Sequence, residues 1–185
     1  MIKTISYDLG EVLRLFKEGN TREMRGLSNR LIKEASMENN LAKAELGVMA
    51  YALHKIETKD HIINHEKWPK LKNEITLHLE QAMNAIENGN NKQFMQKLKE
   101  AIQHIEEVDR EMGRFVQSIY EKAKVKQASL AYSYGLSISQ SAELTGANKK
   151  ELQSYIGFTT MHDEETETKT IAERVKELQE LLEAS

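Results

Sequence analysis

The 185-residue sequence contains no cysteine and a single proline, and only 6% of its residues are aromatic. Without cysteine there can be no disulfide framework, thiolate metal site or cysteine nucleophile. No run of 18 apolar residues occurs, and the first residues lack the apolar core of a signal peptide. We therefore expect a cytoplasmic protein that does not insert into membranes.

Glu, Lys, Leu, Ala, Met and Gln dominate what remains, and these residues favour helix. The predicted fold class is all-α: a helical bundle with a long heptad-patterned helix, followed by a helix-turn-helix and a C-terminal helix. We place a five-helix bundle at residues 1–128, the helix-turn-helix at 129–160, and an acidic linker with a terminal amphipathic helix at 161–185.

Local signals divide the bundle region into helices. Gly19-Asn20 should end the first helix, and Thr21 should cap the second. A third helix is expected at about 38–56, and 58–69 reads as a connector. Pro69 suits the first turn of a fourth helix, which Asn88-Gly89 should end.

A heptad row runs through the fifth predicted helix, with apolar residues spaced alternately by four and three. Such a row keeps one stripe facing a partner helix, either inside the same subunit or at a dimer seam. The short loop to the preceding helix favours packing within the subunit. The row comprises Phe94, Leu98, Ala101, Ile105, Val108, Met112, Phe115 and Ile119.

The formal net charge of −3 is unevenly distributed. Residues 1–120 hold 18 basic and 18 acidic side chains, 121–160 hold five and three, and 161–185 hold three and eight. A global basic surface is absent, so any contact with nucleic-acid phosphates must be local to 121–160.

Within that segment, Ala142, Gly146 and Leu152 have the spacing of a helix-turn-helix. A small residue is needed where the two helices cross, glycine permits a left-handed turn, and an apolar residue must lock the second helix onto the first. We expect Ser139 to cap the first helix and Asn148 the second. Leu144, Leu152 and Ile156 would form the apolar underside.

If the motif binds double-stranded DNA, the start of the second helix should face base edges in the major groove. Lysine can pair with guanine and glutamine with adenine, while hydroxyls and helix-start amides hold phosphates. Glu151 would accept from cytosine but repel phosphate, and three upstream lysines could add backbone contacts, namely Lys122, Lys124 and Lys126. The candidate DNA-binding residues are Ser139, Gln140, Asn148, Lys149, Lys150, Gln153 and Ser154.

The segment from Ile138 to Leu152, extended by Tyr132 and Gly135, resembles the helix-turn-helix of small prokaryotic antitoxins and related transcriptional regulators. The likeness covers about residues 130–157. It implies operator binding through this motif and a protein partner such as a toxin, often a ribonuclease, held by a separate segment. Thr145 departs from the pattern, which has a larger apolar residue there.

The terminal helix is the candidate partner-binding or dimerisation segment because it is too short to be stable alone. Its apolar stripe would otherwise pack against the bundle. The stripe consists of Ile171, Val175, Leu178 and Leu182, spaced four, three and four.

Other site types find little support. His61 and His65 are four apart, but no further metal ligands are specified, so a solvated connector is the better interpretation. No Gly-rich phosphate loop, GxSxG elbow or HExxH pair occurs. We expect a dimeric, non-enzymatic DNA-binding regulator without metal or cofactor. The alternative is a helical protein-protein interaction adaptor in which the helix-turn-helix is an inert subdomain.

Overall fold

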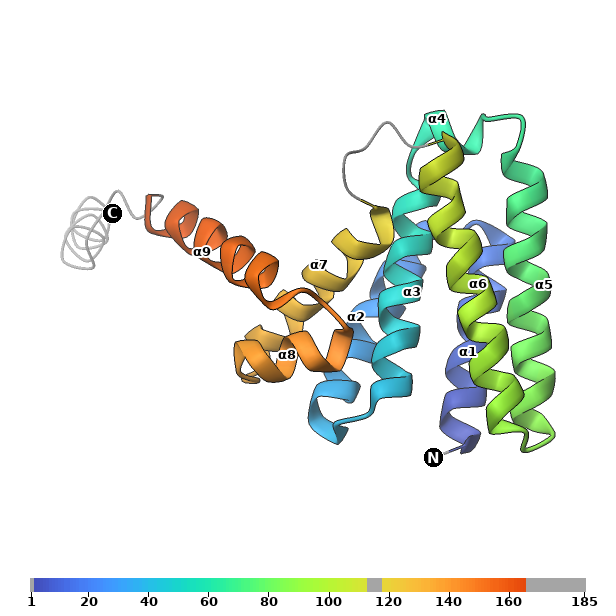
Figure 1. Ribbon diagram of the computed structural model, residues 1–185, viewed down its shortest axis with the longest axis horizontal. Coiled ribbons are helices and arrows are strands. Elements are labelled where there is room, and N and C mark those ends of the chain that lie inside the picture. Colours follow the sequence, from blue (N-terminus) through green and yellow to red (C-terminus); the bar gives the residue numbers. More distant parts are fainter. Residues whose placement is uncertain (1, 113–117, 166–185) are drawn as a thin grey trace, which may run out of the picture.

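The structure is a computed structural model that describes residues 2–112 and 118–165 (Figure 1). Within these ranges all regular secondary structure is helical, which confirms the all-α prediction. No helix in these ranges combines the length and apolar character that crossing a membrane requires.

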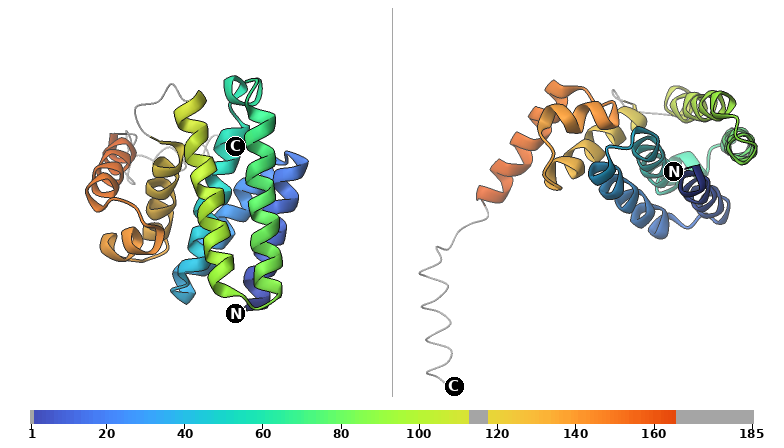
Figure 2. Two further views of the ribbon diagram at one scale, coloured as in Figure 1. Left: turned by 45° about the vertical axis from the view of Figure 1, so that its right-hand side comes forward. Right: turned by 90° about the horizontal axis from the view of Figure 1, so that it is seen from below.

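The helices are stacked in three layers (Figure 2). One outer layer is a hairpin of α5 (Trp68–Glu87) and α6 (Asn91–Met112). The middle layer contains α1 (Ile2–Glu18), α2 (Thr21–Glu38) and α3 (Leu41–Glu57), and the short α4 (Asp60–Ile63) leads from it to α5. The other outer layer contains α7 (Ile119–Ser133), α8 (Ile138–Thr145) and α9 (Lys149–Glu165).

Polar residues between the helices set their boundaries. Gly19 follows α1 with a φ of 65°, as its position in the sequence predicted. The cap of α2 is Asn20, whose side chain accepts a hydrogen bond from the backbone N–H of Glu23. The prediction of Thr21 as this cap was therefore wrong by one residue, because asparagine serves equally well as a cap and comes first.

One apolar core spans all three layers. The predicted row on α6 is buried in this core from Phe94 to Met112, and α6 packs on α5. Phe16 of α1 meets Trp68 of α5 edge-on, with ring centroids 6.3 Å apart. The described part of the row thus packs within its own subunit.

The expectation of one helix running through Ile119 was wrong. The structure ends α6 at Met112, and Ser118 caps a new helix by accepting a hydrogen bond from the N–H of Tyr120 at 3.1 Å. Phe115 lies outside the described residues. Position 128, predicted as a domain boundary, falls inside α7.

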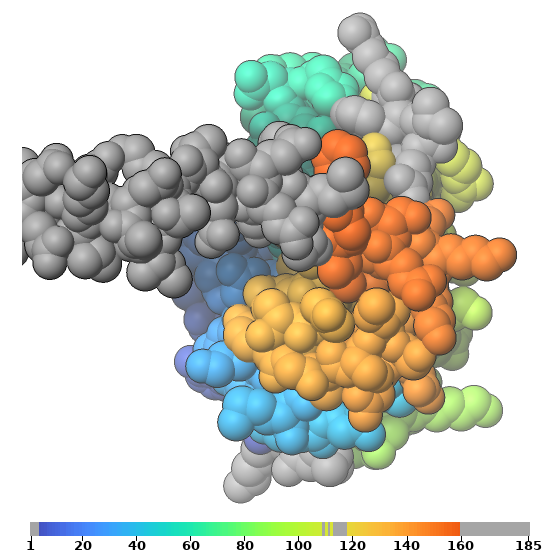
Figure 3. Space-filling view, turned by 90° about the vertical axis from the view of Figure 1, so that its left-hand side faces the viewer, coloured from blue at the N-terminus to red at the C-terminus, as the bar shows by residue number. Residues whose placement is uncertain are grey.

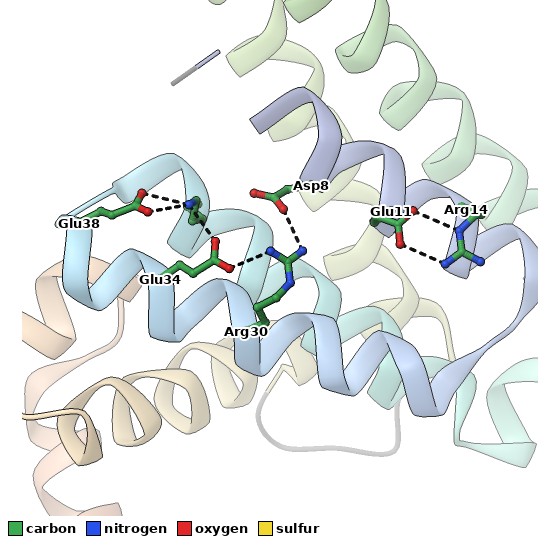
Figure 4. A network of polar contacts seen from close by, with 7 residues as sticks. Asp8, Glu11, Arg14, Arg30, Glu34 and Glu38 are labelled. Carbon is green, nitrogen blue, oxygen red and sulfur yellow. Dashed lines mark hydrogen bonds and ion pairs between the residues drawn. The ribbon is translucent and has the colours of Figure 1, made fainter. Parts of the chain in front are cut away.

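A chain of ion pairs joins the three middle helices (Figure 4). Asp8 of α1 is fully buried and lies 2.9 Å from Arg30 of α2, which also contacts Glu34. Lys43 of α3 is buried and contacts Glu34 and Glu38. Burial alone would lower the pKa of Lys43, but its hydrogen bonds to these two carboxylates raise it.

Candidate nucleic-acid interface

The turn between α8 and α9 centres on Gly146, whose φ is 67° and ψ is 21°. Its backbone N–H and that of Ala147 both donate to the carbonyl of Ala142. A Cβ atom at Gly146 would find Lys124 no closer than 3.9 Å. Glycine is therefore favoured here by the left-handed backbone and not by crowding.

A small apolar cluster holds α8 and α9 on α7. Ala128 of α7, Ala142 of α8 and Leu152 of α9 are buried together. Ile156 packs at the edge of the same cluster. Leu144, predicted to share the underside with Leu152, instead belongs to the main core, because it faces the bundle and not α9.

The predicted cap of α8 was wrong. Ser137, not Ser139, accepts a hydrogen bond from the N–H of Gln140, and the Gln140 side chain accepts one from the N–H of Ser137. This reciprocal pair is a capping box, and it places Ser139 inside the first turn of α8. Asn148 caps α9 as predicted, since its Oδ1 accepts from the N–H groups of Lys150 and Glu151 at 2.9 and 3.3 Å.

The structure therefore divides the predicted DNA-binding residues into two groups. The side chains of Gln140 and Asn148 are used by the caps. The rest are exposed, one on α8 and the others on the first turns of α9, and α8 and α9 lie next to each other in the space-filling view (Figure 3). These exposed residues are Ser139, Lys149, Lys150, Gln153 and Ser154.

A groove of about 1100 Å³ runs beside α9. Lys150 and Ser154 line it from α9, and Lys122 and Lys126 line it from α7. Lys124, expected to act with these two, pairs with Glu121 at 2.7 Å and does not line the groove. Residues four apart on a helix share a face, whereas residues two apart do not, so Lys124 points away from the side that Lys122 and Lys126 share.

Sequence reasoning missed the third wall of the groove. Tyr51 and Lys55 come from α3, and Lys59 follows it. Tyr155 of α9 accepts a hydrogen bond from the Nζ of Lys126 at 3.0 Å. No local spacing in the sequence signals that α3, more than 60 residues earlier, lies opposite α7 and α9.

The histidines of the predicted connector lie between α3 and α5. His61 lies in α4, and the Nδ1 of His65, just beyond it, accepts a hydrogen bond from the N–H of Lys67 at 3.2 Å. Across residues 2–112 and 118–165, no group of three or more potential ligands could hold a metal ion.

Comparisons of this chain with protein-family models, with curated proteins and with solved structures found no match.

Proposed function

We propose that the protein is a non-enzymatic, DNA-binding transcriptional regulator that reads an operator through α8, the Gly146 turn and α9. The observation that carries this proposal is the exposed start of α9. Lys149, Lys150 and Gln153 point outward there, while Leu152 anchors the same turn of helix from beneath.

The chemistry of this surface suits the major groove of double-stranded DNA. Lys149 and Lys150 supply cations that can contact phosphates or guanine, and Gln153 can pair with adenine. The backbone N–H of Ser139 lies in the first turn of α8, where amide groups are free to bind phosphate. Glu151, which is exposed and lies between Lys150 and Gln153 in the sequence, would favour cytosine and disfavour other bases.

A single α8–α9 unit makes few contacts with DNA, so specific binding requires two such units. We propose that the protein binds DNA as a homodimer, on half-sites about 34–36 Å apart. A toxin partner, implied by the resemblance to antitoxins, stays a prediction.

The test is fluorescence anisotropy with duplex DNA taken from upstream of the gene and with a random duplex, between 50 and 300 mM salt. We expect tighter binding to the upstream duplex, weakened by salt because lysine contacts release counterions. Lys149→Ala/Lys150→Ala should lower the affinity at least tenfold and reduce the salt slope by about two.

Lys33→Ala/Lys99→Ala is the matched control, because it removes the same charge from exposed positions on α2 and α6. We expect its affinity to stay within about twofold of the unmodified protein. Absence of binding at micromolar protein, or an equal loss in both double variants, would contradict the proposal.

The alternative function, a helical protein-protein adaptor, is favoured by one observation. The groove beside α9 is lined by aliphatic and aromatic side chains as well as lysines, and apolar lining is typical of sites that bind protein segments.

A further inference from the structure

Cations and apolar side chains share the groove between α3, α7 and α9. Lys55, Lys126 and Lys150 line it, and none of these three forms an ion pair within the described part of the chain. Lys55 and Lys126 instead lie over the rings of Tyr51 and Tyr155, with Nζ to centroid distances of 5.5 and 5.4 Å. The groove thus holds more lysines than carboxylates, since Glu151 is the one acidic residue among the described residues that line it.

The floor and one edge of the groove are apolar. Ile119, Ala123 and Val125 of α7 line its floor, and Phe158 of α9 lines its edge with 76% of its surface exposed. An amphipathic helix with acidic flanks matches this combination, since its apolar face would cover the floor and its carboxylates would meet the lysines. Single-stranded nucleic acid could stack bases on Tyr51, Tyr155 and Phe158, but it would leave the aliphatic floor of the groove without an apolar partner.

We propose that this groove is the docking site for the chain's own C-terminal segment, residues 168–185. The segment lies outside the described residues. It carries the stripe Ile171, Val175, Leu178 and Leu182, and its 18 residues hold four glutamates and three basic side chains. Its apolar spacing matches the apolar floor of the groove, and its four glutamates can pair with the lysines that line the walls.

The position of the segment in the chain supports the same occupant. It follows α9, which forms one wall of the groove and ends at Glu165. The five residues 166–170 can span roughly 17 Å, which is enough to reverse direction as in a two-helix hairpin. The next 15 residues, if helical, would run for about 22 Å back along α9. Covalent linkage also raises the effective concentration to the order of millimolar.

Carbodiimide cross-linking of the full chain at low micromolar concentration tests this proposal, because it joins lysines to adjacent carboxylates. We expect peptide mapping to find links from Lys55, Lys126 and Lys150 to the glutamates of residues 173–183. Lys33 and Lys99, which are exposed on α2 and α6 and do not line the groove, should give at least tenfold fewer links to that segment.

Two further arms make the test decisive. Mixing isotope-labelled and unlabelled protein should leave the links within single copies, and links between copies would overturn docking in the same chain. Leu178→Ser/Leu182→Ser keeps every reactive group but removes half of the apolar stripe, so it should abolish the links. Persistence of the links in that variant, or links no more frequent than those of Lys33 and Lys99, would overturn the proposal. None of these outcomes depends on DNA binding.

Discussion

His54 shows how burial of one residue makes stability depend on pH. Its ring is buried at the end of α3, and Nδ1 lies 2.8 Å from the carbonyl oxygen of Thr21. Burial lowers the pKa of His54 by more than the hydrogen bond to the Thr21 carbonyl raises it, and the positive charges of Lys55 and Arg25 lower it further. The unfolded chain therefore binds a proton at His54 more readily than the folded protein does.

Because the pKa of His54 is lower in the folded state, the free energy of unfolding should fall as the pH drops below about 6.5. His54→Gln keeps a polar group near Thr21 but cannot be protonated in this range, so it should reduce the loss of stability between pH 7.5 and 5.5. Urea unfolding at pH 7.5 and at pH 5.5 measures the free energy of unfolding for each protein. His61→Gln, which changes an exposed histidine, is the control, and an equal pH dependence in His54→Gln and the unmodified protein would contradict the prediction.

At the scale of the element, two glycines in the same unit should respond oppositely to alanine. Gly146 has a positive φ, whereas Gly157 lies within α9 with no atom near the position of a Cβ. Gly146→Ala should lower the free energy of unfolding by about 1 kcal/mol through backbone strain. Gly157→Ala should raise it by about 0.5–1 kcal/mol through helix propensity. Urea unfolding distinguishes the two, and changes of the same sign would contradict this account.

The sequence predicted helices and turns well where a local chemical signal marks them. Gly146 and Asn148 carry such signals, and the structure confirms both. The true cap of α8 was also readable, since Ser137 and Gln140 have the capping-box spacing. The break between α6 and α7 was not, because the apolar period continues unchanged into Ile119 and hides the new start at Ser118. The wall that α3 contributes to the groove arises only from tertiary packing.

At the scale of the whole molecule, the helix-turn-helix shares its core with the bundle. Leu144 of α8 is 5% exposed and belongs to the apolar cluster that also holds Trp68. Leu144→Ala should therefore lower the free energy of unfolding by about 3 kcal/mol. In urea unfolding, the fluorescence of Trp68, the only tryptophan in the sequence, should show the same shift of the midpoint as helical circular dichroism does.

Leu77→Ala provides the comparison for this experiment. Leu77 lies on α5 with 49% of its surface exposed, so its truncation should change the unfolding midpoint little. If Leu144→Ala removed part of the helical signal while Trp68 kept its original midpoint, the helix-turn-helix would be an independent folding unit.

The attachment of α9 has a consequence for how this protein can evolve. Among the described helices, α9 packs only on α7 and α8, and Leu152 and Ile156 make its contacts with their apolar cluster. The outward positions of its first turns, Lys149, Lys150, Gln153 and Ser154, are exposed. Substitutions at these positions leave the packing intact, so descendants of one ancestral gene could change the surface that α9 presents while keeping the same scaffold.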